Sequence, residues 1–202
     1  MKLKLLVISD IHGAMKSVNK ITAAYHKYDP DLSVICGDIT HFGSRGDAVD
    51  ILEKIPTEVI GVTGNCDPGG VEHAFGDVGG EYIELKKVEK ADVSFIGLSG
   101  SDYSEEKIDL FKERSKNTDV YVFHQPPYGI LDEASRGKHI GHKKLLDVVK
   151  ENSPRLVLSG HVHEDRGKEK REGRIHMNPG PAGDDKLGLV DISEERIKTK
   201  LI

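Results

Sequence analysis

Residues 156–163 read Leu-Val-Leu-Ser-Gly-His-Val-His. The apolar run Leu156-Val157-Leu158 is typical of a short buried strand, and Gly160-His161-Val162-His163 follows where that strand ends. Residues i and i+2 of an extended segment point the same way, so a loop at this place can direct both imidazoles at one point. Two imidazoles directed at one point suit a metal ion, and this strand end is therefore a candidate metal site.

Four other predicted strands end in side chains of the same chemical kind. Short apolar runs rich in β-branched residues predict strands over residues 3–9, 32–36, 57–62 and 120–123. The side chains that follow these strands are Asp10 and His12, Asp38, Asn65, and His124. We expect all five strand ends to converge on one site.

The order of elements predicts a parallel sheet in the first third of the chain. Helices are predicted over residues 15–28 and 47–54, between the first three strands. Alternating strands and helices are typical of α/β proteins, in which ligands bind outside the carboxyl ends of the strands. Asp10, Asp38 and Asn65 fall at those ends.

The remaining elements indicate mixed pairing. Residues 81–87 alternate and residues 92–98 are strand-like, which predicts an antiparallel pair. Helices are predicted over 105–115 and 141–151. The end of the chain is typical of hairpins, formed by residues 167–171 with 174–178 and by residues 187–192 with 196–202.

Composition narrows the class of protein. The 202 residues are 37% hydrophobic and 31% charged, as expected of one globular domain spanning residues 1–202. The net charge of -5 argues against a nucleic-acid binder that acts through charge alone. Two cysteines without a Cys-x-x-Cys pattern favour a reducing, cytoplasmic compartment. The N-terminus reads as a strand instead of a signal peptide, and no apolar run is long enough to span a membrane.

Seven strand-end side chains carry the chemistry. Taken singly, an Asp after a strand is usually a turn or cap residue, and a lone His is usually a structural polar residue. Their joint occurrence at five strand ends is better explained by metal binding, because borderline divalent metals take imidazole and carboxylate together. Seven ligands exceed one tetrahedral ion and suit two ions, for which Asp38 is the natural bridging carboxylate.

The motifs Asp10-x-His12, Gly37-Asp38, Gly64-Asn65, His124 and Gly160-His161-x-His163 resemble the five blocks of the calcineurin-like metallophosphoesterase superfamily. The short chain and the Gly-Asn-Cys-Asp variant resemble its small bacterial and archaeal phosphodiesterase branch. The resemblance implies a four-layer α/β/β/α sandwich with two mixed sheets flanked by helices. It also implies two divalent metal ions, of which Mn, Ni, Fe, Co and Zn are all candidates, and a bridging hydroxide that attacks phosphorus in line.

The resemblance further implies how the ligands divide between the two ions. One ion would be held by Asp10, His12, Asp38 and His163, and the other by Asp38, Asn65, His124 and His161.

One position departs from the family pattern. Many members have His directly after the Asn, where it is thought to stabilise the transition state or protonate the leaving oxygen, and here that position is Cys66. A thiol with a pKa of about 8.5 is a poorer proton donor near neutral pH than imidazolium. Asn65, Cys66, Asp67 and His41 are the candidate catalytic residues, with Asp67 as an orienting group and His41 as a substitute donor or an exposed loop residue.

Other side chains have weaker or divided interpretations. The basic segment 136–143, which includes His139 and His142, is either a clamp for a substrate phosphate or a solvated helix start. His176 reads as a strand residue, His26 and His73 as surface residues, and Cys36 as a core residue.

The sequence therefore predicts a metal-dependent phosphoesterase that hydrolyses phosphodiesters, with monoesters as the second possibility. Its substrate would be a small phosphate ester or a nucleotide. The alternative is an interaction scaffold with a weak or silent centre, and metal-dependent hydrolysis of a non-phosphate bond is a third reading. A homodimer through an exposed sheet edge is also open.

Overall fold

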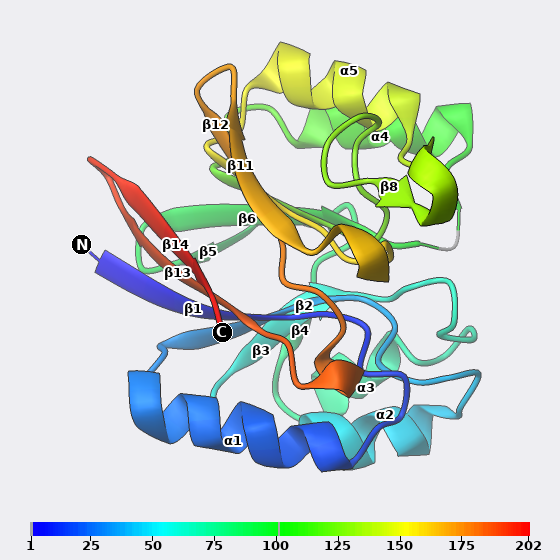
Figure 1. Ribbon diagram of the computed structural model, residues 1–202, viewed down its shortest axis with the longest axis vertical. Helices are drawn as coiled ribbons and strands as arrows, with labels where there is room; N and C mark the ends of the chain where they lie inside the picture. The colour runs from blue at the N-terminus through cyan, green and yellow to red at the C-terminus, as the bar shows by residue number, and fades with distance from the viewer. Residues whose placement is uncertain (1, 101) are drawn as a thin grey trace.

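Two six-stranded sheets lie face to face in the computed structural model, which describes residues 2–100 and 102–202 (Figure 1). The strand order is β14-β13-β1-β2-β3-β4 in the first sheet and β11-β12-β10-β7-β6-β5 in the second. Helices α1, α2 and α3 cover the outer side of the first sheet, and α4 and α5 cover the outer side of the second (Figure 1). The predicted four-layer α/β/β/α architecture is confirmed.

The first sheet and its helices come from both ends of the chain. Their bounds are β1 (Lys2–Ile8), α1 (Lys16–Tyr28), β2 (Leu32–Cys36), α2 (Arg45–Leu52), β3 (Val59–Val62), α3 (His73–Asp77), β4 (Glu81–Tyr82), β13 (Gly188–Ser193) and β14 (Ile197–Leu201). Strands β1 to β4 are parallel, and β13 pairs antiparallel with β1.

The second sheet is formed by the middle of the chain. Its elements are β5 (Val88–Lys90), β6 (Val93–Leu98), α4 (Glu105–Arg114), β7 (Val120–Phe123), α5 (Lys143–Asn152), β10 (Leu156–Leu158), β11 (Gly167–Arg171) and β12 (Arg174–Asn178). Short elements complete the fold: β8 (Glu133–Ala134), β9 (Lys138–His139), and the 3-10 helices η1 (Ser135–Gly137), η2 (His163–Asp165) and η3 (Ala182–Asp184). Strands β6, β7, β10 and β12 are parallel.

Three hydrophobic clusters correspond to the three spaces between the four layers. Val34 and Cys36 of β2 face the space between the sheets, whereas Ile35 faces the helices α1 and α2. A third cluster, which includes Phe111 and Val148, joins the second sheet to α4 and α5. Strands buried on both faces must be apolar throughout, which explains the continuous apolar runs in the sequence.

The predicted antiparallel pairing of residues 81–87 with 92–98 is wrong. Residues 81–82 form β4, which runs parallel to β3 in the first sheet, and residues 88–90 form β5, which pairs antiparallel with β6 in the second. The chain crosses between the sheets in this segment, with Ile83 buried in the core between them. Helix α3 was not predicted from the Gly-rich segment around it.

Candidate metal centre

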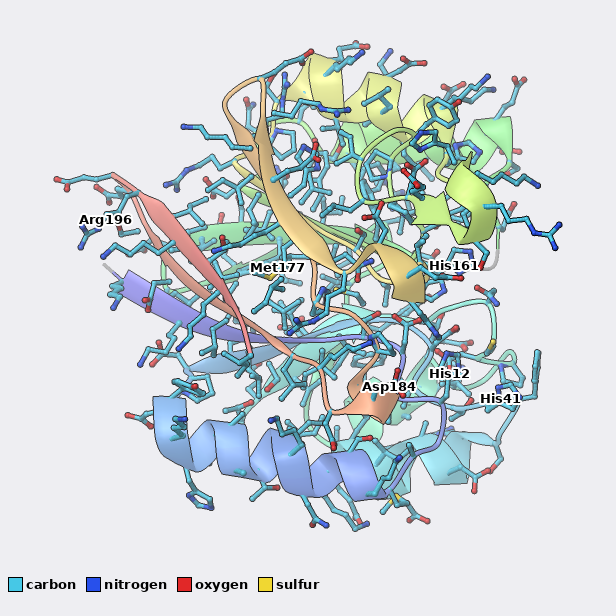
Figure 2. All side chains as sticks on the ribbon, in the orientation of Figure 1. His12, His41, His161, Met177, Asp184 and Arg196 are labelled. Carbon is cyan, nitrogen blue, oxygen red and sulfur yellow. The ribbon has the colours of Figure 1, made fainter. Side chains whose placement is uncertain are left out.

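All five predicted strand ends meet at one edge of the molecule. Asp10 and His12 follow β1, Asp38 follows β2, Asn65 follows β3, His124 follows β7, and His161 and His163 follow β10. The first three strands belong to one sheet and the last two to the other. Figure 2 shows His12 and His161 at the same end of the two halves, with His41 farther out beyond His12.

One group of candidate ligands gathers around His12. Its Nε2 atom lies 3.3 Å from His163 Nε2, 3.8 Å from an Asp10 carboxylate oxygen and 3.7 Å from Asp38 Oδ2. His163 Nε2 lies 3.2 Å from the same Asp10 oxygen. Metal–nitrogen bonds of about 2.0–2.1 Å place tetrahedral ligand atoms about 3.4 Å apart, so these separations suit one ion.

The second group gathers around the fully buried His124. Its Nε2 atom lies 2.9 Å from Asn65 Oδ1, 3.2 Å from His161 Nδ1 and 3.5 Å from Asp38 Oδ2. Asp38 Oδ2 therefore lies between the two groups, 3.7 Å from His12 Nε2 and 3.5 Å from His124 Nε2. This is the position that a carboxylate bridging two ions must have.

The chemistry of the donor atoms fits cations. His124 Nδ1 lies 2.9 Å from the Cys36 carbonyl oxygen, and because a carbonyl can only accept, Nδ1 carries the proton. In the neutral imidazole the Nε2 lone pair then faces the Asn65 and Asp38 oxygens, which are acceptors too. Such a cluster of lone pairs around a buried point is satisfied by a cation, and a carbonyl that orients a ligating imidazole is a common second partner.

The loops that carry these ligands have unusual backbone conformations. Asp10, His12, Asp38 and His161 adopt positive φ angles of 53°, 49°, 52° and 68°. Positive φ is uncommon outside glycine, and strained residues concentrate at functional sites. Glycines let these loops pack tightly: a Cβ added to Gly64 would lie 2.0 Å from Asp38 Oδ1, and one added to Gly160 would lie 1.8 Å from Ser9 Oγ.

The candidate catalytic residues lie on the same edge. Asp67 is buried and accepts hydrogen bonds from the backbone N–H groups of Ile39, Thr40 and Gly64. Side-chain atoms of Cys66, His41 and His12 lie within 4.8 Å of one another. His41 is exposed, but its ring packs edge-on against the His12 ring, with centroids 5.7 Å apart. The structure thus brings the four candidate catalytic residues to the edge that carries the candidate ligands; they are Asn65, Cys66, Asp67 and His41.

Burial and neighbouring charges shift several pKa values at this edge. Burial raises the pKa of Asp10, but the hydrogen bond to His163 and the His124 charge outweigh it and lower that pKa overall. The same hydrogen bond raises the pKa of His163, whereas burial lowers that of His161. Burial and the Asp38 carboxylate raise the pKa of the Cys66 thiol to about 12. The centre thus places the carboxylates of Asp10 and Asp38 beside the imidazoles of His12, His124 and His163.

The residues that lead into the basic segment 136–143 lie against the loop that carries His163. The Glu133 N–H donates to Asp165 at 2.8 Å, and the Ser135 hydroxyl donates to Glu164 at 2.9 Å. His139 is held by Asp132, whose carboxylate oxygen lies 2.6 Å from its Nδ1 and raises its pKa. A phosphate clamp in this segment stays a prediction.

His142 is half-buried directly before α5 and stacks on Tyr103. The other three histidines and Cys36 lie as expected. His26 and His73 are exposed, and His176 is a buried residue of β12. Cys36 is buried in the core between the sheets.

Two contributors near the site were not predicted. Asp132 is almost fully buried and holds His139 from seven residues away, and Phe42 is exposed beside His41. The only sequence signal for Asp132 was an acid within a Gly- and Pro-rich loop, and Phe42 had none beyond its place after His41.

The geometry agrees with a comparison to known families, in which the model of the calcineurin-like phosphoesterases matches residues 3–165. The chain belongs to the calcineurin-like phosphoesterase family. It is thus a metal-dependent phosphoesterase, for which the family implies divalent metal ions and phosphate-ester substrates.

Several known proteins are similar to this phosphoesterase in sequence or in fold. An uncharacterized protein of Methanocaldococcus jannaschii, MJ1162, is 28% identical over 205 residues, covering 89% of this chain and 88% of that protein. A dimetal phosphatase from Danio rerio has a TM-score of 0.71 at 14% identity, covering 98% of this chain and 95% of that one. An archaeal phosphodiesterase has a TM-score of 0.64 at 18% identity, covering 99% and 100%. No helix within residues 2–100 or 102–202 has the length and hydropathy to cross a membrane.

Proposed function

We propose that this phosphoesterase hydrolyses phosphodiesters at a dinuclear metal centre. The position of Asp38 Oδ2 between the His12 and His124 groups carries the proposal. Asp10, His12, Asp38 and His163 would hold one ion, and Asp38, Asn65, His124 and His161 the other. Two divalent cations, when bound, generate a nucleophile from water near neutral pH and neutralise charge on the phosphoryl oxygens.

The protein's own residues would orient that chemistry. The Cys36 carbonyl keeps the His124 Nε2 lone pair directed inward. Asp67 holds the loops after β2 and β3 together, which fixes Asp38 relative to Asn65. We assign Asp67 a positioning role, because its carboxylate oxygens already accept hydrogen bonds from backbone N–H groups.

The choice of diesters over monoesters rests on the Gly64-Asn65-Cys66-Asp67 segment, which resembles the small phosphodiesterase branch of the family. A solved structure of the same fold is described as an archaeal phosphodiesterase, which is consistent with this choice.

A catalytically silent scaffold is the second candidate, because Cys66 replaces the usual histidine. Against it, all seven ligand positions hold residues able to bind a metal, and their donor atoms converge. A homodimer could use the exposed edge of β14, which pairs with β13 alone in its sheet.

Hydrolysis assays test the proposal. Metal-stripped protein would be supplied with Mn, Ni, Co, Zn or Mg and assayed with bis-p-nitrophenyl phosphate and p-nitrophenyl phosphate. We expect metal-dependent turnover, with the higher kcat/KM for the diester, and its loss in an Asp38→Ala, His161→Ala double variant. Stoichiometric metal binding without turnover would favour the scaffold, and a higher kcat/KM for the monoester would reject the diester assignment.

A further inference from the structure

Two exposed apolar side chains flank the centre. Among the described residues, two large hydrophobic residues are exposed to solvent. The exposed fraction is 45% for Met15 and 67% for Phe42. Met15 lies three residues after His12, and Phe42 lies four residues after Asp38. Both therefore lie on loops that lead directly away from candidate ligands.

Phe42 is held outward by a strained backbone. Its φ angle is 58°, in the left-handed region that bulky residues rarely adopt. Its N–H donates to the Cys66 carbonyl at 2.8 Å, which ties it to the loop of the centre. The Phe42 side chain is 67% exposed, so the strained position lies at the surface beside the candidate centre. Strained residues concentrate at functional sites.

A row of aromatic rings connects Phe42 with the ligands. The Phe42 and His41 rings pack at 65° with centroids 5.1 Å apart, and the His41 and His12 rings pack at 74° with centroids 5.7 Å apart. Figure 2 shows His41 beyond His12 at the outer edge of the molecule. A group bonded to a phosphate at the centre could extend along this row toward solvent.

A hollow of about 260 Å³ lies beside His41, the middle ring of this row, and is lined by Met15, Thr40, His41, Asp47, Asp50 and Ile51 among others. Its volume is below the roughly 300–1,000 Å³ of pockets for drug-sized ligands, so it suits a single ring system. Hydrogen bonds from Ser44 lower the pKa of Asp47, which is therefore ionised near neutral pH. Two carboxylates would repel a second phosphate, so the group that enters should be uncharged.

We propose that Phe42 and Met15 bind an uncharged aromatic substituent of the phosphate ester, either an aryl group or a nucleobase. This rests on the proposed function and specifies its substrate class. Aromatic contact with Phe42 supplies affinity that a small aliphatic ester cannot obtain. Met15, which is flexible and polarizable, can adapt to rings of different shape.

Calorimetry on metal-loaded protein tests the proposal without requiring turnover. Phenyl phosphate and methyl phosphate share the phosphate and differ in the ring. Phe42→Asn should weaken binding of phenyl phosphate by about 2- to 10-fold and leave methyl phosphate unchanged. Phe42→Trp should retain the preference for phenyl phosphate. Since Asn tolerates the left-handed region, Phe42→Asn should not lower the melting temperature.

A matched control is Glu172→Asn, which replaces another residue of positive φ, in the turn between β11 and β12. Glu172→Asn should change neither the affinity for phenyl phosphate nor that for methyl phosphate. AMP distinguishes the two ring sources: a loss for AMP as large as that for phenyl phosphate identifies a nucleobase site, and a loss for phenyl phosphate alone identifies an aryl site.

Unchanged affinity for phenyl phosphate in Phe42→Asn would overturn the inference, as would an equal loss for methyl phosphate, which would indicate damage to the centre. Failure of the proposed function is a separate result. If the proposed function fails, the wild type will not hydrolyse bis-p-nitrophenyl phosphate, whether or not it prefers phenyl phosphate to methyl phosphate.

Discussion

Asp67 Oδ1 lies 2.8 Å from the backbone nitrogen of Thr40 and 3.0 Å from its hydroxyl oxygen. The other carboxylate oxygen accepts from the N–H groups of Ile39 and Gly64 at 3.1 and 2.9 Å. One buried carboxylate thus joins the loop after β2, which carries Asp38, to the loop after β3, which carries Asn65. The position of Asp38 relative to Asn65 depends on this connection.

Asp67→Asn should therefore weaken both folding and metal binding. The amide nitrogen cannot accept the hydrogen bonds that one carboxylate oxygen accepts, so buried N–H groups lose their partners. We expect about 2 kcal/mol of lost stability and a melting temperature about 4–8 °C lower. Metal affinity should fall by about 10- to 100-fold, as for other residues that orient ligands.

Thermal unfolding and metal titration would measure these effects, with Asp184→Asn as the control because Asp184 is exposed. An unchanged metal affinity would contradict the positioning role of Asp67.

Removal of Asp38 should affect both ions, whereas removal of His163 should affect one. Asp38 Oδ2 lies near both ligand groups, whereas His163 Nε2 lies near His12 and Asp10 of the first group. We expect Asp38→Ala to lose close to two equivalents of metal and His163→Ala close to one, with activity reduced by roughly 100-fold or more in Asp38→Ala. Elemental analysis of dialysed protein measures the stoichiometry. Equal losses in the two variants would exclude a bridging Asp38.

Cys66→His should raise the hydrolysis of esters with poor leaving groups. An S–H group is a weak donor, whereas imidazolium can donate a proton to a departing alkoxide. We expect kcat/KM for a methyl ester to rise by about 10-fold or more and that for the p-nitrophenyl diester to change little, with metal stoichiometry unchanged. Cys66→Ser is the control. An equal rise for both substrates would point to an effect on metal binding instead.

His176 should make the fold sensitive to mild acid. Its side chain is 2% exposed, and its Nδ1 has no hydrogen-bond partner among residues 2–100 and 102–202. Burial together with Arg171 and Arg174 lowers its pKa to about 4. The unfolded chain takes up a proton at His176 below about pH 6.5, but the native protein does not until about pH 4. Unfolding free energy therefore falls as pH decreases through this window.

His176→Leu should remove about 2–3 kcal/mol of that pH dependence. Urea denaturation of metal-free wild type and variant at pH 7.0, 5.5 and 4.5 would measure it, and other titrating groups cancel in the difference. Parallel pH profiles for the two proteins would show that His176 is not responsible.

Much of the candidate centre could be predicted because its ligands follow strand ends. Parallel strands present their carboxyl ends at one edge, so Asp38, Asn65 and His124 could be grouped before their distances were known. The local pattern of residues 81–87 could not show which sheet they join. Alternation of polar and apolar residues indicates a half-buried strand but does not indicate which strand it pairs with. Residues 81–87 lie where the chain crosses from one sheet to the other.

By itself, the sequence determined the order of most elements and the seven candidate ligands, because periodicity and strand-end chemistry are local properties. The four layers were implied by the resemblance of its motifs to a known family. Only the tertiary structure decided that Asp38 Oδ2 lies between two ligand groups, that Asp67 joins two loops, and that Phe42 extends into solvent beside His41. These relationships join residues from different strand ends or depend on how much of a side chain its neighbours cover. The packing of the two sheets against each other sets both the distances between strand ends and the exposure of side chains, and no local sequence pattern predicts it.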